Sequence, residues 1–74
     1  MTLDKLELNK TSKITKLNCI GNIRRRMLDL GIIKDTSITP ILNSPSGNLV
    51  AYEVRGTIIA IRKEDSCKIE VLNI

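Results

Sequence analysis

Few side chains in this sequence of 74 residues could take part in acid–base or covalent chemistry. Histidine, the usual general base near neutral pH, is absent. The candidate carboxylates, Glu64 with Asp65 and the isolated Glu53, are typical of solvent-facing charges in a turn and on a strand. The sequence contains no phosphate-binding P-loop, dinucleotide fingerprint or nucleophile elbow. It therefore predicts a protein without enzymatic activity.

The two cysteines give little support for metal chemistry. Cys19 and Cys67 lie far apart in the sequence and form no CxxC pair. Zinc sites place cysteine and histidine ligands at short, regular spacings, so no metal or other cofactor is expected. In a reducing compartment both thiols are expected to be small apolar core residues. A disulfide or a soft-metal pair is the alternative.

The charge balance favours an acidic partner. The formal net charge is +4, and such an excess assists encounters with acidic surfaces. Proteins that bind single-stranded nucleic acid stack bases on aromatic side chains, whereas Tyr52 is the only aromatic residue here, so we expect no nucleic-acid partner. No apolar run approaches the roughly 20 residues of a membrane span, and residues 1–10 lack a secretory signal. A cytoplasmic protein, not embedded in a membrane, is expected.

One helix is indicated over residues 22–30. Asn22 can accept a backbone N–H bond as the N-cap, and Gly31 suits the left-handed conformation that ends a helix. The consecutive arginines at 24–26 spread over roughly 200° of the helix, because successive residues turn by about 100°. The apolar face, at spacings i, i+4 and i+7, consists of Ile23, Met27 and Leu30. A single helical turn is also expected before Asn9.

Five segments have the alternation or the β-branched content of strands. They are residues 13–20, 36–42, 50–55, 57–62 and 67–71.

Particular residues predict how these strands behave. Ile14 and Leu17 are three apart, which predicts a bulge in the first strand. Pro40 has no N–H group, so the second strand is expected at a sheet edge or with a bulge. Gly56 permits the turn between the third and fourth strands. Isoleucines at 58, 59 and 61 predict a fourth strand covered on both faces, and residues 63–66 are expected to form a turn.

Short strands in this number favour a closed barrel, because closure removes exposed sheet edges. The prediction is a mainly β fold: a small SH3-like barrel of about five strands with one short α-helix inserted after the first strand. It forms a single domain over residues 1–74. An OB-like barrel is less favoured, because its helix usually falls between later strands. An edge strand near Pro40 makes a weak homo-oligomer plausible.

The order of these segments resembles the FeoA family, small cytoplasmic SH3-like proteins of bacterial ferrous iron uptake. The resemblance covers residues 3–72, and several linked motifs in one order are far more specific than any single motif. The motifs are residues 23–32, Pro45 in a loop, and residues 52–56, 59–64 and 69–71. The turns depart from the family pattern, because Thr11 and Asp35 stand where glycine is usual.

The resemblance implies an accessory role beside the membrane transporter FeoB, whose cytoplasmic part carries a GTP-binding domain. SH3-like barrels can accept a peptide or a small helix in a groove between loops. The expected partner surface joins the helix flank to the loop at residues 43–48. Its residues are Arg24, Arg25, Arg26, Ser44, Pro45, Gly47 and Tyr52. A solvated helix face is the competing interpretation of the arginines.

An alternative function is a metal-responsive regulatory module that binds a transition metal ion, since the same fold is appended to iron- and manganese-dependent repressors. An attached winged-helix domain would mark such a module, and the sequence up to Ile74 contains none. The free-standing accessory protein is therefore favoured. Direct metal binding would depend on scattered ligands such as Asp29, Asp35, Glu53, Glu64 or Asp65.

Overall fold

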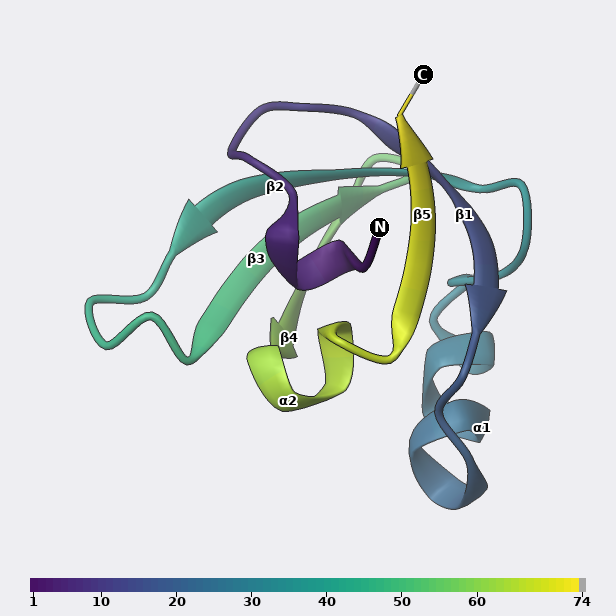
Figure 1. The fold of residues 1–74 in the computed structure, drawn as a ribbon. Helices are drawn as coiled ribbons and strands as arrows, with labels where there is room; N and C mark the ends of the chain where they lie inside the picture. Colours follow the sequence, from purple (N-terminus) through teal and green to yellow (C-terminus); the bar gives the residue numbers. More distant parts are fainter. Residues whose placement is uncertain (74) are drawn as a thin grey trace.

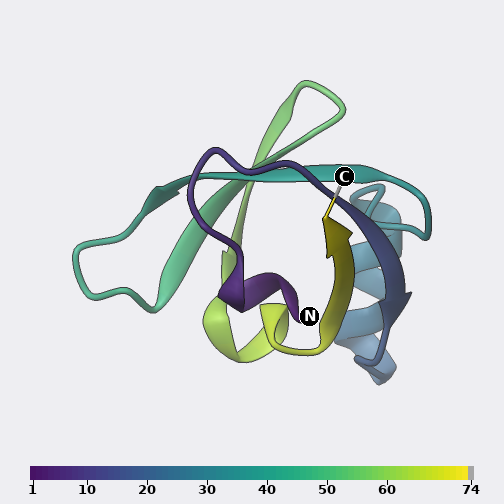
Figure 2. The same cartoon turned by 45° about the horizontal axis from the view of Figure 1, so that its top comes forward.

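One five-stranded antiparallel sheet organises the chain in the computed structural model, which describes residues 1–73 (Figure 1). The elements, in chain order, are η1 (Leu3–Lys5), β1 (Ser12–Leu17), α1 (Gly21–Asp29), β2 (Ser37–Asn43), β3 (Leu49–Val54), β4 (Thr57–Arg62), α2 (Lys63–Ser66) and β5 (Ile69–Asn73). The strand order is β4-β3-β2-β1-β5, so β4 and β5 are the edges. The sheet is strongly curled, and Figure 2 shows β1 and β5 facing β3 and β4 across the interior. Five strands with one helix after the first are confirmed.

A single apolar core fills the interior of the curled sheet. Most of this core comes from the strands, because every second side chain of a strand points inward. The η1 turn, α1, the β1–α1 connection and the segment before β2 each add one apolar core residue. The core residues are Leu3, Ile14, Cys19, Met27, Ile32, Ile38, Tyr52, Val54, Ile59, Ile61, Ile69 and Val71.

The expected irregularities in β1 and β2 are both present. The pairing of β1 with β5 shifts register between Ile14 and Lys16, which confirms the bulge, although the strand ends at Leu17. The pairing of β2 with β3 shifts between Pro40 and Leu42. A bulged β2 is thus confirmed, but β2 is the middle strand of the sheet, so an edge position is wrong.

The pairing pattern explains how a middle strand accepts Pro40. Tyr52 of β3 pairs with Pro40 on one side and with Ile59 on the other, and its N–H and C=O groups serve the Ile59 side. Pro40 therefore needs no N–H toward β3. On its other side β1 pairs with β2 only at Ser37 and Ile38, and the Pro40 carbonyl accepts from Asn9 N at 2.6 Å.

The β3–β4 hairpin follows the prediction closely. Its two turn residues, Arg55 and Gly56, have φ angles of 53° and 81°, a left-handed pair that fits the twist of a tight hairpin. Val54 and Thr57 close the turn as paired residues. Coverage of β4 on both faces is wrong: Ile58 is 59% exposed, because β4 is an edge strand whose outer face no element of residues 1–73 covers.

Three local predictions near the helices are also wrong. The N-cap of α1 is Ile20, which makes no side-chain cap, because Gly21 with φ of 64° begins the helix one residue before Asn22. Residues 63–66 form the short helix α2 instead of a turn. Cys67 follows α2 and is exposed, so only Cys19 is a core thiol. The helix end at Gly31, with φ of 87°, is as predicted.

The turn after α1 shows what the departure from the family pattern does. Asp35, which stands where glycine is usual, has φ of 73°. This left-handed conformation costs little for glycine and more for a residue with a Cβ atom. Asp35 therefore keeps the turn geometry at a cost in strain.

Candidate protein-binding surface

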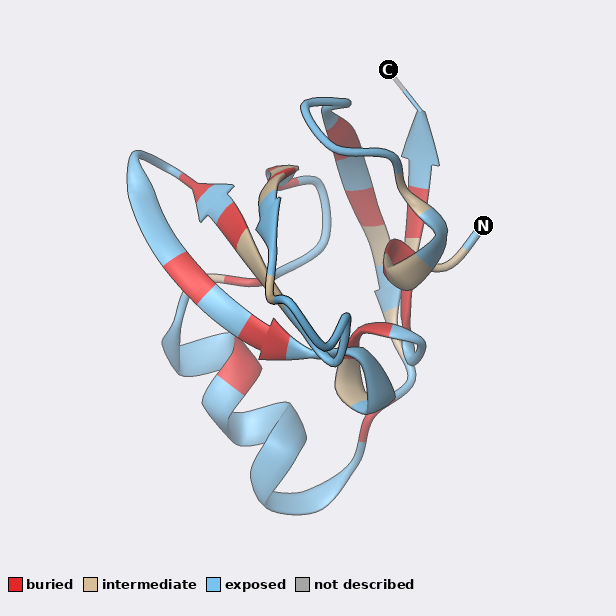
Figure 3. Ribbon diagram, turned by 90° about the vertical axis from the view of Figure 1, so that its left-hand side faces the viewer, coloured by how far each residue is buried: buried red, intermediate tan, exposed pale blue. Residues whose placement is uncertain are grey.

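A hollow on the surface separates α1 from the edge strand β4. This α1–β4 cleft has a volume of about 410 Å³. Figure 3 shows α1 beside β4, on the side away from β3. Its lining residues are Ile23, Arg26, Met27, Leu30, Leu49, Ala60, Ile61, Arg62 and Asp65.

The helical wall of the α1–β4 cleft is apolar and only partly covered. Met27 is 4% exposed and holds α1 to the core. Ile23 and Leu30, one turn to either side, remain 38% and 39% exposed. The predicted shared face of these three residues therefore splits into one anchor and two apolar side chains that face the cleft. These two side chains give the α1–β4 cleft an apolar wall.

The three arginines of α1 have different surroundings. Arg24 Nη1 donates to the carbonyl of Leu17 at 3.0 Å, so it ties the helix to the end of β1. Arg26 lines the α1–β4 cleft. Arg25 is exposed. Within residues 1–73 Asp29 forms no ion pair with any of them.

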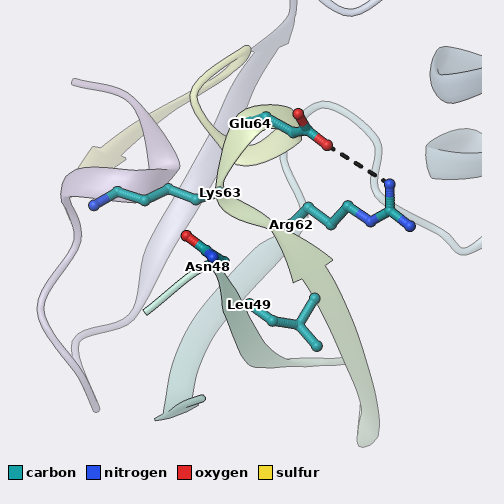
Figure 4. Close-up of a pocket in the computed structure, with 5 residues that line it drawn as sticks. All are labelled: Asn48, Leu49, Arg62, Lys63 and Glu64. Carbon is teal, nitrogen blue, oxygen red and sulfur yellow. Dashed lines mark ion pairs between the residues drawn. The ribbon is translucent and has the colours of Figure 1, made fainter. Parts of the chain in front are cut away.

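The β4 side of the α1–β4 cleft carries a second cation. Figure 4 shows Arg62 and Lys63 extending in opposite directions, with Leu49 on the same side as Arg62. Arg62 Nη1 lies 3.6 Å from Glu64 Oε1, and both side chains are 72% exposed. An ion pair this exposed contributes little to stability and leaves Arg62 available to another carboxylate.

The loop after β2 is stabilised by its own hydrogen bonds. Gly47 N donates to the carbonyl of Ser44 at 3.0 Å, and Leu49 N donates to Ser44 Oγ at 3.2 Å. Gly47 has φ of 78°, which the turn requires. Pro45 is exposed and lines a shallow apolar hollow with Leu42 and Ala60. Ser44 and Gly47 thus shape the loop, and Pro45 faces outward.

The predicted surface residues are not brought together at one place. Figures 1 and 2 both place the loop and α1 on opposite sides of the molecule, with β4 between them. Arg26 lines the α1–β4 cleft, whereas Ser44, Pro45 and Gly47 line a different hollow, beside η1. A partner that touched both would have to cross β4.

Tyr52 belongs to the core, and its inclusion in a partner surface is wrong because its side chain is 1% exposed. Burial raises the pKa of its phenol above the usual 10.0, and the negative charge of Asp4 acts in the same direction. The Ser66 hydroxyl opposes that rise in pKa. Tyr52 is therefore a neutral core residue of β3.

Sequence reasoning missed an apolar strip on the outer face of the hairpin. Leu42 pairs with Ala51, and Ala51 pairs with Ala60, so the three side chains form one row across β2, β3 and β4. Leu42 is 65% exposed, and Ile58 continues the strip at 59%. Hairpin residues two apart in the sequence lie on the same face, and the apolar residues among the outward-facing ones were a signal for this strip.

The remaining chemistry-bearing residues are dispersed. Within residues 1–73 no three histidine, cysteine, aspartate or glutamate residues converge as a metal site would need. None of the helices in the same range has the length and apolar character of a membrane span.

Comparison with known proteins identifies the family. The family model described as FeoA domain matches residues 1–73. The chain belongs to the FeoA domain family. The resemblance drawn from the motif order is thereby confirmed.

A curated relative joins this domain to a transporter. The chain is 30% identical over 71 residues to the Fe(2+) transport protein A/Fe(2+) transporter FeoB fusion protein of Porphyromonas gingivalis. The match covers 96% of the chain and 8% of that fusion protein, so the chain spans a small part of the relative.

Solved structures share the fold. The FeoA protein of Chlorobium tepidum matches with a TM-score of 0.94 at 22% identity, over 100% of this chain and 70% of that one. A zinc complex of Stenotrophomonas maltophilia FeoA, described as a prokaryotic SH3 domain protein, matches with a TM-score of 0.80 at 25% identity, over 96% and 88%. A manganese-dependent transcriptional repressor matches with a TM-score of 0.90 at 11% identity, over 100% and 41%. The SH3-like fold is confirmed.

Proposed function

We propose that this FeoA-family chain is a non-enzymatic accessory protein of ferrous iron uptake, which acts in the cytoplasm by binding the cytoplasmic region of a FeoB-type transporter. The observation that carries the proposal is the fusion protein of Porphyromonas gingivalis, in which a segment similar to 96% of this chain is covalently joined to FeoB. Domains that are fused in one protein commonly act together as separate chains in another. The chain carries +4 charge, which favours an acidic partner surface.

The surface of the chain suits a protein partner. The α1–β4 cleft combines exposed apolar side chains with two arginines, a composition enriched at protein interfaces. The solvent-facing Pro45 and the apolar strip at Leu42 extend this character toward the loop. The two predicted parts, the arginines of α1 and the loop, are proposed as separate contact regions of one partner.

Nitrogen-15 amide titration with the cytoplasmic region of the FeoB-type transporter of the same organism tests the proposal. Saturable shifts along α1, β4 and the 43–48 loop are expected at physiological salt, and repetition with guanine nucleotides shows whether binding follows the GTPase cycle. Arg25→Glu and Pro45→Ala, singly and together, are expected to weaken binding. Lys13→Glu on β1 is the matched control, because it makes the same type of charge change away from α1. Absence of saturable shifts contradicts the proposal.

The metal-responsive alternative has one observation in its favour, the zinc complex of Stenotrophomonas maltophilia FeoA. Anaerobic titration of the chain with ferrous iron and with zinc distinguishes the two functions. Saturable heat at micromolar metal would favour the alternative. Its absence, together with binding to the transporter region, favours the accessory role.

A further inference from the structure

The two edges of the sheet differ in how their backbone groups are used, and β4 is the open one. Because Val54 and Thr57 close a two-residue turn, they form a hydrogen-bonded pair. Hydrogen-bonded and non-bonded pairs then alternate along β4. Ile59 and Ile61 bond to β3, and the N–H groups of the intervening residues point away from β3. These residues are Ile58, Ala60 and Arg62.

Independent contacts fix this assignment. Leu49 pairs with Arg62, yet Leu49 uses its own backbone on the other side: its N–H donates to Ser44 Oγ at 3.2 Å and its carbonyl accepts from Ser44 N at 2.8 Å. Arg62 therefore has no backbone partner in β3. Within residues 1–73, no turn, loop or side-chain hydrogen bond takes up the N–H of Ile58, Ala60 or Arg62. All three residues are exposed.

Two of these three residues belong to the α1–β4 cleft, whereas Ile58 does not line it. Ala60 and Arg62 line it from the strand, and Ile23 and Leu30 line it from the helix. An exposed row of edge N–H groups is a template for an added strand, and pockets beside it receive alternate side chains. A segment that paired with β4 would place side chains against the apolar wall of α1. Its opposite side chains would extend the apolar strip beyond Ile58.

The charge of the α1–β4 cleft indicates what kind of segment could bind there. Arg26 and Arg62 line it, and Asp65 is the one acidic residue among its lining residues. Arg25 lies next to Arg26 in the sequence and is exposed. A second copy of this chain would bring two such basic surfaces together, each on a molecule of charge +4, which opposes pairing. An extended segment that carries carboxylates complements both the strand edge and the charge.

We propose that an extended acidic segment of the partner adds to β4 as a sixth strand in the α1–β4 cleft. This inference rests on the proposed function, because the segment is assigned to the cytoplasmic region of the FeoB-type transporter. It adds to that function the mode of binding: backbone pairing supplies affinity, and Arg26 and Arg62 supply the preference for acidic side chains.

Ala60→Pro tests the backbone pairing directly. Proline removes the outward N–H of Ala60 and leaves the β3 ladder intact, because that N–H does not bond to β3. Ala60→Ser is the matched control, since it changes the side chain and keeps the N–H. In titrations with the transporter's cytoplasmic region, Ala60→Pro is expected to weaken binding about tenfold or more and Ala60→Ser less than about threefold.

Two further measurements need no proline. Hydrogen exchange at the amides of Ile58, Ala60 and Arg62 is expected to slow at least about tenfold in the complex of the unaltered chain, while Ile59 and Ile61 are already protected when it is free. Arg62→Glu is expected to weaken binding more than Lys13→Glu does.

The outcomes separate this inference from the proposed function. Binding with fast exchange at the three β4 amides, or with full affinity for a folded Ala60→Pro, overturns the strand addition and leaves the proposed function standing. Absence of binding by the unaltered chain overturns both. Protection of the same amides that grows with the concentration of the chain alone shows a second copy at β4 and overturns the assignment to the partner.

Discussion

The sheet has two edge strands, and the chain treats them in opposite ways. At β5 the N-terminal segment runs alongside: Val71 N donates to the carbonyl of Met1 at 2.8 Å, and Thr2 forms a bridge to Glu70. Leu3 then enters the core with 0% exposure. At β4 the N–H groups of alternate residues point away from β3 instead, and Ala60 and Arg62 line the α1–β4 cleft. One edge is thus closed by the chain's own first residues, and the other is kept open beside a basic helix.

The open edge at β4 is an exception to the way in which proteins usually treat exposed sheet edges. Exposed edges invite aggregation, and proteins blunt them with charges, bulges or covering segments. The outward residues of β4 are Ile58, Ala60 and Arg62, of which only Arg62 is charged. Helix α1 stands beside the edge and limits which segments can approach it. In the proposed binding mode, the open edge at β4 serves recognition, whereas the closed edge at β5 serves stability.

The largest effect is expected at the closed edge. Leu3→Ala removes a buried side chain and is expected to cost about 2–5 kcal/mol of unfolding free energy, with loss of the contacts that hold the N-terminal segment on β5. Leu42→Ala, at an exposed leucine on the outer strip, is the matched control and is expected to cost less than about 0.5 kcal/mol. Urea unfolding curves measure both. Equal losses of unfolding free energy for the two substitutions would contradict the distinction between the buried N-terminal segment and the exposed outer strip.

The next effect separates neighbouring residues on β4. Ile59→Pro removes an N–H that bonds to β3 and is expected to cost about 3 kcal/mol or more. Ala60→Pro removes an N–H that faces the cleft and is expected to cost less than about 1 kcal/mol. Thermal unfolding followed by circular dichroism measures the difference. A greater loss for Ala60→Pro would mean that the edge assignment is reversed.

A smaller effect appears only at alkaline pH. The raised pKa of Tyr52 means that the folded chain retains a proton that the unfolded chain loses near pH 10.0. Stability from this group is therefore complete below that pH and is lost as pH rises through the folded pKa. Tyr52→Phe is expected to lose less stability between pH 9 and 11 than the unaltered chain does. Parallel loss in both proteins would show that other groups dominate.

The smallest effect concerns the exposed ion pair. Glu64→Gln removes the contact with Arg62 and is expected to change stability by less than about 0.5 kcal/mol. The same change frees Arg62 and lowers the negative charge beside the cleft, so affinity for the acidic segment is expected to rise slightly. Calorimetric titration measures this change in affinity. Weaker binding of Glu64→Gln would contradict the proposed preference for acidic side chains.

Local features of the fold, such as turns, bulges and helix ends, were the easier ones to predict from sequence. Alternation at Val50, Tyr52 and Val54 and the turn at Gly56 are local signals, and the hairpin follows them. The Ile14 bulge and the helix end at Gly31 are local in the same way. Each is written within a few residues of the position that it determines.

The open edge could not be predicted in this way. Whether Ile58 is covered depends on which strand lies at the end of the sheet, and that is decided by contacts between distant segments. Tyr52 was misplaced for the same reason, because alternation gives two faces and does not say which face the rest of the chain covers. Cys67 was misplaced because it ends the short helix α2, and the last strand begins only at Ile69. The arginines at 24–26 were located on the helix, but the strand opposite them was not.

Amide hydrogen exchange of the free chain tests the open edge most directly. At low concentration, Ile58, Ala60 and Arg62 are expected to exchange at nearly the rate of an unstructured peptide, while Ile59 and Ile61 of β4 and Val71 of the closed edge are strongly protected. That alternation along β4 is the predicted result. Uniform protection from Ile58 to Arg62 would contradict it, because it would mean that the edge is already occupied.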